Sequence, residues 1–151
     1  MTTSPAPTIR PLQPSDEAEW RRLWTAYLDF YNTSAPEEVY QTLFSRLLSD
    51  DPASFSCFVA DAGDRLVGLT HYVFHPHAWN INEVCYLQDL YADPDSRGTG
   101  VGRALIEAVY QAADARKAAN VYWLTQDSNE TARRLYDRIG KLPPFLRYQR
   151  G

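Results

Sequence analysis

The chain has few cysteines, no excess of positive charge and no long apolar run, and each of these shortages excludes a class of protein. The two cysteines, Cys57 and Cys85, have neither a Cys-x-x-Cys spacing nor neighbouring ligands, so we expect no metal site and no disulfide framework. A reducing cytoplasm is the simplest setting for such a chain. No apolar run approaches the length of a membrane span, and the N-terminal residues lack the apolar stretch of a secretory signal. The formal net charge of -4 gives no electrostatic reason to expect a nucleic-acid partner.

The chain is rich in the residues that build a core. Its 151 residues are 44% hydrophobic and 13% aromatic, which suits a sizeable core and argues against disorder. No internal repeat, low-complexity segment or linker interrupts it. The sequence therefore predicts one folded domain over residues 1–151, in a soluble cytoplasmic protein without nucleic-acid or membrane partners.

Apolar patterns divide the chain into strands and helices. Strands are expected at residues 8–12, 55–60, 66–74, 83–92, 121–125 and 145–148. Helices are expected at residues 16–31, 34–48, 100–117 and 129–139, the second opened by a Ser-x-x-Glu capping box and the last closed by Gly140. This order implies a mixed sheet with helices on both faces and a crossover helix after the fourth strand. The fold class is α/β, or α+β by a stricter definition.

A glycine-rich turn between a strand and a helix carries the chemistry. Gly98, Gly100 and Gly102 alternate between a proline turn and the helix that follows, with Arg97 and Arg103 beside them. Glycine allows the backbone to approach a ligand closely, and the unpaired amides and dipole of a helix N-terminus favour an anion. A turn that only reverses the chain is the alternative. Three alternating glycines with arginines favour a phosphate-binding site.

The motif is neither of the two common nucleotide loops. The Gly-Lys-Ser/Thr of a Walker A loop is absent, and the glycine spacing does not match Gly-x-Gly-x-x-Gly. Residues 97–102, Arg-Gly-Thr-Gly-Val-Gly, instead resemble the acetyl-CoA signature Arg/Gln-x-x-Gly-x-Gly/Ala of the GCN5-related N-acetyltransferase (GNAT) family. Residues 129–140 are similar to the family's Asn-x-x-Ala-x-x-Leu-Tyr-x-x-x-Gly helix. The resemblance covers nearly the whole chain and is nearest to the yeast histone and polyamine acetyltransferase group.

The resemblance implies a GNAT-type, mostly antiparallel sheet and acetyl-CoA as cosubstrate, without a metal. Backbone groups of Leu90 and Ala92 would pair with the pantetheine arm, and the Leu90 N–H would polarise the thioester carbonyl. Amides from Arg97 to Arg103 would hold the pyrophosphate. The residues so expected to bind the cofactor are Leu90, Tyr91, Ala92, Arg97, Gly98, Thr99, Gly100, Val101, Gly102, Arg103, Asn129 and Tyr136.

The implied reaction is direct attack of a primary amine on acetyl-CoA in a ternary complex. The amine would belong to a polyamine, another small molecule or a protein lysine. Tyr136 would face the sulfur of the cofactor, where a phenol can protonate a thiolate leaving group. An alkylammonium must lose a proton before it attacks, so a carboxylate is useful, and Asp89 and Glu83 on the fourth strand are the candidates. A β-bulge could turn the Asp89 side chain to the other face of the sheet, so the alternation of the strand does not decide on which face Asp89 lies. A solvated strand end is the simpler reading of Glu83.

Two functions of other classes stay open. One is a non-catalytic acyl-CoA-binding sensor module, against which the presence of Tyr136 argues. The other, weaker alternative is a nucleotide-binding protein.

His75 and His77 suggest a metal pair, but no third ligand is spaced to join them.

The end of the chain predicts an assembly. Only residues 145–151 follow Pro143 and Pro144, which is enough for one strand, whereas many family members end with a hairpin. An exposed sheet edge invites a partner, so a homodimer through Phe145, Leu146 and Tyr148 is expected. The alternative is a monomer whose edge is guarded by arginines.

Overall fold

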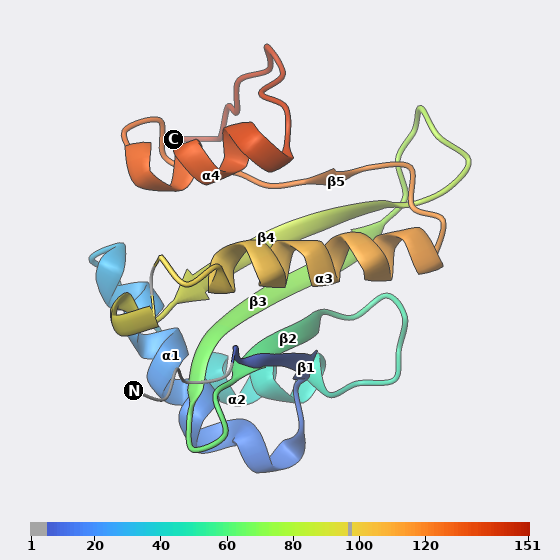
Figure 1. Cartoon of the computed structure of the whole chain (residues 1–151). Helices are drawn as coiled ribbons and strands as arrows, with labels where there is room; N and C mark the ends of the chain where they lie inside the picture. Colours follow the sequence, from blue (N-terminus) through green and yellow to red (C-terminus); the bar gives the residue numbers. More distant parts are fainter. Residues whose placement is uncertain (1–5, 97) are drawn as a thin grey trace.

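A five-stranded sheet forms the centre of the protein, and the computed structural model describes residues 6–96 and 98–151 (Figure 1). The strands are β1 (Thr8–Pro11), β2 (Ser56–Asp61), β3 (Leu66–His75), β4 (Val84–Ala92) and β5 (Val121–Tyr122). They lie side by side in chain order; the first four are antiparallel, and β5 is parallel to β4. A parallel pair needs a crossover connection, which a helix supplies here. The predicted mixed, mostly antiparallel sheet is confirmed.

Four helices cover the two faces of the sheet. On one face lie α1 (Glu17–Phe30) and α2 (Glu37–Leu47), and on the other lie α3 (Val101–Ala115) and α4 (Glu130–Ile139) (Figure 1). The predicted helices on both faces are therefore confirmed. Among the described residues, no helix combines the length and the apolar character needed to cross a membrane.

Each face of the sheet has its own apolar core, because each helix turns one apolar stripe inward. Under α1 and α2, the core contains Trp20, Leu23, Trp24, Phe44 and Leu47 packed on Leu12, Cys57, Val59, Leu69 and Tyr91. Under α3, it contains Ile106, Val109 and Ala113 packed on Tyr72, Phe74, Cys85 and Leu87. Both cysteines are thus free and buried, one in each core.

The beginning of α3 lies unusually close to the sheet at Gly68. A Cβ atom at this position would stand 2.9 Å from Cγ1 of Val101 and 3.0 Å from the carbonyl oxygen of Tyr91. Neither atom can move aside without a cost in free energy, since one belongs to a buried side chain and the other to the backbone. Gly68 therefore sets the position of the glycine-rich turn above the sheet.

A β-bulge at Gln88 changes the direction of the side chains along β4. In the pairing with β3, Leu87 and Asp89 lie opposite consecutive residues, so Gln88 is an extra residue. Leu87 faces α3, and simple alternation would point Asp89 the same way. The extra residue reverses the alternation, so that Asp89 and Tyr91 instead face α1 and α2.

Two predicted strands differ from the structure. The strand expected at residues 145–148 is wrong: the segment forms no strand, and its apolar side chains are exposed, Phe145 by 76% and Tyr148 by 89%. Strand-forming residues do not make a strand without a neighbour to accept their hydrogen bonds and a face to cover. The fifth strand is shorter than predicted and ends at Tyr122.

Candidate active site

The glycine-rich turn connects β4 to α3 through a short 3-10 turn at Pro94–Ser96. Gly98 and Gly100 have φ angles of 83° and 85°, in the left-handed region that favours glycine. A Cβ atom at either position would meet nothing within 4 Å. The backbone conformation therefore requires these glycines, while the space beside them is open to a ligand. Arg97, which the sequence placed in the same site, lies outside the described residues.

The first turn of α3 offers backbone amides to that open space. The amides of Gly100, Val101, Gly102 and Arg103 have no acceptor within the helix, because the ladder begins with the Ala104 N–H bonded to the Gly100 carbonyl at 2.9 Å. The side chain of Val101 is buried in the core, so only its backbone can serve a ligand. An anion here would also gain from the helix dipole.

Thr99 and Arg103 have local partners in the turn and the helix. The Thr99 N–H and hydroxyl both donate to the Ser96 carbonyl, which stabilises the turn. The Arg103 guanidinium donates to Glu107 at 2.9 Å, and its side chain is half exposed. A phosphate would therefore meet a partly neutralised charge at Arg103.

The second motif lies beside the first. A Cβ atom at Gly102 would stand 3.6 Å from Leu135, so the start of α3 touches α4. Tyr136 follows Leu135, and its ring meets the Trp123 ring edge-on at 5.5 Å. Burial raises the pKa of the Tyr136 phenol to about 12, and the neighbouring Tyr31 adds to the increase. Asn129 caps α4, with its side-chain oxygen accepting the Ala132 N–H at 3.3 Å.

The strands β4 and β5 diverge on the way to the glycine turn. They pair at only two positions, Cys85 with Val121 and Tyr86 with Tyr122. From residue 87 onward, no residue of β5 as described lies opposite β4, and the chain after β5 runs away from it toward α4 (Figure 1). Leu90, Tyr91 and Ala92 lie in this divergent part, next to the turn. An extended ligand arm entering there would lead directly to the amides of α3.

Asp89 lies on the face of β4 that is covered by α1 and α2, opposite to α3, and a buried hydrogen-bond chain holds it there. His71 Nδ1 lies 3.0 Å from a carboxylate oxygen of Asp89, and Trp20 Nε1 lies 3.0 Å from His71 Nε2. Indole nitrogen only donates, so His71 Nε2 accepts and Nδ1 carries the proton that is donated to Asp89. The imidazole of His71 therefore fixes one carboxylate oxygen of Asp89, and the hydroxyl of Tyr27 lies within hydrogen-bonding reach of the same carboxylate.

Tyr27 of α1 and Tyr31, which directly follows α1, lie in the region between Asp89 and Tyr136. Tyr27 lies within hydrogen-bonding reach of Asp89 and of Tyr31, and its pKa is raised by burial and by the negative charge of Asp89. The Tyr27 and Tyr31 rings are 5.1 Å apart. Tyr31 in turn is close enough to raise the pKa of Tyr136. The structure thus places Tyr27 beside the predicted base Asp89, and Tyr31 in the electrostatic environment of the predicted acid Tyr136.

Glu83, the other predicted base, lies elsewhere. It precedes β4 and is six residues from Asp89, which is about 20 Å along an extended chain. Its carboxylate accepts a hydrogen bond from Arg116 at 2.7 Å, and its carbonyl accepts the Ala119 N–H at 2.8 Å. Glu83 therefore fastens the strand end to the segment after α3, away from the glycine turn.

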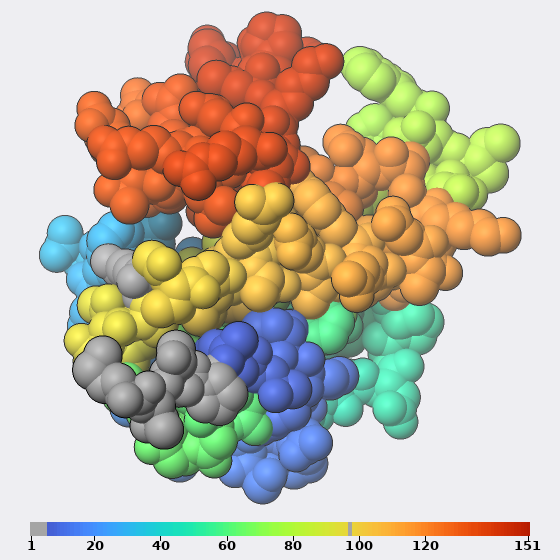
Figure 2. Space-filling view, in the orientation of Figure 1, coloured from blue at the N-terminus to red at the C-terminus, as the bar shows by residue number. Residues whose placement is uncertain are grey.

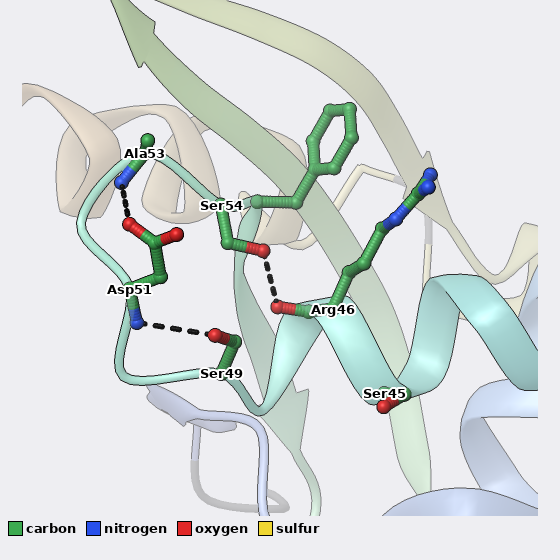
Figure 3. A pocket seen from close by; sticks show the side chains of 7 residues that line it. Ser45, Arg46, Ser49, Asp51, Ala53 and Ser54 are labelled. Carbon is green, nitrogen blue, oxygen red and sulfur yellow. Dashed lines mark hydrogen bonds between the residues drawn. The ribbon is translucent and has the colours of Figure 1, made fainter.

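A cleft of about 360 Å³ adjoins Asp89 on the face covered by α1 and α2. Its lining residues are Trp24, Glu38, Val39, Thr42, Leu43, Arg46, Phe55, Gln88 and Asp89. A second hollow of about 430 Å³ lies beyond Arg46 and is lined by Ser45, Arg46, Ser49, Asp51, Ala53, Ser54 and Phe55 (Figure 3). The polar groups of this second hollow bond mainly to one another: Ser54 donates to the Arg46 carbonyl at 2.8 Å, and Asp51 accepts the Ala53 N–H at 2.9 Å. The first cleft is the one that a second substrate can enter next to Asp89.

His75 at the end of β3 and His77 in the loop after it have ordinary partners. His75 lies 2.7 Å from the Tyr122 hydroxyl and 2.8 Å from the Pro76 carbonyl, and His77 lies 3.1 Å from the Asn80 amide. Within residues 6–96 and 98–151, no group of three or more His, Cys, Asp or Glu side chains has the arrangement of a metal site.

Diverging strands, a left-handed glycine turn and a tyrosine helix beside it define an acetyltransferase of the class that the sequence resembles. A family model described as "Acetyltransferase (GNAT) family" matches residues 20–140. The chain belongs to this family and is an acetyltransferase. Members of the family use acetyl-CoA as cosubstrate, and the open space beside Gly98 and Gly100, at the N-terminus of α3, fits the pyrophosphate of that molecule.

Relatives and solved structures agree with this assignment. D-amino-acid N-acetyltransferase HPA3 of Saccharomyces cerevisiae is 35% identical over 144 residues, which cover 94% of this chain and 89% of that protein. A thialysine N-epsilon-acetyltransferase of Bos taurus is 29% identical over 94 residues, covering 57% of this chain and 55% of that protein. The crystal structure of a ribosomal-protein-alanine N-acetyltransferase from Brucella melitensis biovar Abortus 2308 shares the fold, with a TM-score of 0.79 at 22% identity over 95% of this chain and 98% of that one.

Several residues of the site were missed by the reasoning from sequence. They are Trp20, Glu38, Arg46 and His71. Only His71 carries a recognisable signal, because it interrupts an apolar run on a buried strand, where a polar side chain requires partners. Trp20 is indistinguishable in the sequence from other members of the apolar stripe of α1.

Proposed function

We propose that this acetyltransferase transfers the acetyl group of acetyl-CoA to the primary amine of a small molecule, by direct attack in a ternary complex. The observation that carries the proposal is Asp89, which the bulge in β4 turns into the cleft beside α1 and α2 while the cofactor turn lies at the end of the same strand. The names of the two relatives support a small amine, since they specify D-amino acids and thialysine.

The cofactor would be held mainly by backbone groups. Amides of residues 98–103 would bind the pyrophosphate, and backbone groups of Leu90, Tyr91 and Ala92 would pair with the pantetheine arm. We also assign Asn129 a contact with the cofactor, in addition to its cap of α4. When bound, acetyl-CoA supplies the thioester carbonyl that the amine attacks.

Asp89 is proposed to accept the proton of the incoming ammonium, directly or through a water molecule. An alkylammonium has a pKa of about 10.4 and reacts only after losing that proton. The His71 N–H engages one carboxylate oxygen at 3.0 Å, and Asp89 lines the cleft that the amine would enter. Glu83 is not part of this proposal, since Arg116 holds its carboxylate far along the strand.

Tyr136 is proposed to protonate the leaving thiolate. A phenol whose pKa is raised to about 12 by burial stays protonated at neutral pH, as a proton donor must. Tyr136 lies on α4, which contacts the first turn of α3. This position supports the role, because the cofactor would pass between β4 and α4 on its way to the first turn of α3.

The test is acetylation of an amine panel, with thiol release followed continuously and the products identified by mass spectrometry. We expect Asp89→Asn to lower kcat/KM at least about 100-fold, in the range for loss of a general base. Glu83→Gln is the matched control and should stay close to wild type. Binding of acetyl-CoA without transfer to any amine would contradict the proposal and favour a non-catalytic sensor.

We further propose a homodimer formed through the C-terminal segment. The residues after α4 occupy one end of the molecule, and the β3–β4 loop projects beside them across an open notch (Figure 2). This segment exposes Leu142, Phe145, Leu146 and Tyr148. Exposed apolar side chains gathered on one segment mark an association site, and a two-fold contact is the commonest solution.

A further inference from the structure

The cleft beside Asp89 contains charges of both signs. Glu38 and Arg46 stand eight residues apart on α2, about 12 Å along its axis, and Thr42 lies between them on the same helical face. Asp89 reaches the cleft from β4. The cleft therefore presents carboxylates and one guanidinium to whatever enters it.

Arg46 differs from the arginines of α1. Arg21 is paired with Glu17 and Glu37, and Arg22 is paired with Glu19. Within the part of the chain that the structure describes, no carboxylate lies within ion-pair distance of Arg46. Its side chain extends away from the hydrogen-bonded turn of residues 49–54 (Figure 3). The guanidinium is thus available for a planar anion, which it can bind through two parallel hydrogen bonds.

The end of the cleft at Arg46 favours an anion, whereas the end at Glu38, eight residues earlier on α2, favours a cation. A second ammonium of the acceptor would meet the like charge of Arg46, whereas a carboxylate would be attracted to it. The remaining walls are largely apolar, from Trp24, Val39, Leu43 and Phe55. A volume of about 360 Å³ is at the small end of ligand pockets, which suits a single small metabolite.

We propose that the acceptor is an amino acid with an apolar side chain and a free carboxylate, and that Arg46 is the residue that recognises this carboxylate. The ammonium would lie at Asp89, and the apolar walls of the cleft would contact the side chain. This inference rests on the proposed acetyl transfer and adds to it the class of acceptor and a specificity-determining residue.

The test compares each amino acid with the amine that lacks only the carboxylate. Suitable probes are both enantiomers of phenylalanine against phenethylamine, and both enantiomers of leucine against 3-methylbutylamine. We expect the wild-type enzyme to favour at least one enantiomer of each amino acid over its amine by about 10-fold or more in kcat/KM. Arg46→Gln should raise the KM for that amino acid by about 10- to 100-fold, with kcat nearly unchanged and the amine unaffected.

Two controls separate recognition from general damage. Arg46→Lys keeps the charge but not the planar fork, so it should retain part of the preference. Arg150→Gln removes an exposed arginine from the C-terminal segment and should leave both kinds of acceptor unchanged. Equal kcat/KM for amino acid and amine in wild type, or equal losses for both in Arg46→Gln, would overturn the inference.

A binding measurement distinguishes this inference from the proposed function. The amino acid should raise the Tm of the wild-type protein in the presence of CoA, and should not raise that of Arg46→Gln. If transfer fails for every acceptor while this pattern of binding holds, the proposed activity is wrong and Arg46 still binds the carboxylate. If amines are acetylated and amino acids do not bind, the activity stands and the assignment of Arg46 is wrong.

Discussion

Replacing His71 by leucine tests the hydrogen-bond chain on which the orientation of Asp89 depends. The imidazole is fully buried, accepts the Trp20 N–H at 3.0 Å and donates to Asp89 at 3.0 Å. Leucine has a similar volume, so packing changes little. It offers neither a donor nor an acceptor, so the substitution leaves the buried indole N–H of Trp20 without its acceptor and removes one hydrogen bond from the nearly buried Asp89 carboxylate.

The structure sets the size of the expected loss. An unsatisfied buried donor costs about 1–3 kcal/mol, and a hydrogen bond to a charged group contributes about 1.5–3 kcal/mol. The apolar surface gained with leucine offsets about 1 kcal/mol of this. We therefore expect His71→Leu to lower the free energy of unfolding by about 2–4 kcal/mol, and to lower kcat because Asp89 is no longer held.

Urea denaturation followed by tryptophan fluorescence measures the change, with a constant m-value showing that the transition is comparable. His75→Leu is the matched control on the same strand: His75 is only half buried and bonds to the neutral Tyr122 hydroxyl at 2.7 Å. We expect it to cost less than about 1 kcal/mol. Equal losses of unfolding free energy in the two variants would refute the reasoning, because the burial of the histidine and the charge of its partner would then have no influence on stability.

Three other predictions concern the cofactor site, the acid and the assembly. Gly100→Glu should weaken CoA binding at least about 100-fold in a calorimetric titration, whereas Gly63→Glu, at a positive φ of 100° in an exposed turn, should leave the affinity unchanged. Tyr136→Phe should lower kcat about 100-fold with little change in the KM for acetyl-CoA. Because the phenol pKa of about 12 keeps Tyr136 protonated below pH 10, the ratio of wild-type to variant kcat should stay constant between about pH 6 and 9, and a ratio that varies there would remove Tyr136 from the acid role. Light scattering at micromolar concentration should give twice the 17.3 kDa of one chain, and deletion of residues 145–151 should restore that single-chain mass.

The glycine turn could be predicted from sequence because its conformation depends on the residues within it. Gly98 and Gly100 are required by left-handed backbone angles, and a left-handed angle is a local property. The helices were predictable for the same reason, since an apolar stripe needs only the period of the helix. The resemblance of residues 97–102 and 129–140 then indicated the family that the family model confirms.

Pairing, in contrast, is decided between segments that are distant in the chain. The bulge at Gln88 exists because β4 pairs with β3, and it alone determines that Asp89 faces α1 and α2. The strand predicted at residues 145–148 failed for the same reason, since β-forming residues need a neighbouring strand that the sequence does not specify.

The cleft is a property of the packed molecule. Sequence determined that a glycine-rich turn and a helix carrying Tyr136 are present in an acetyltransferase of this family. Tertiary structure decided that His71 holds Asp89, that Glu83 is kept away by Arg116, and that Arg46 shares a cleft with Asp89. The physical reason is range: backbone angles and helical stripes are set by neighbours along the chain, whereas charges on different elements meet only after the helices have packed on the sheet.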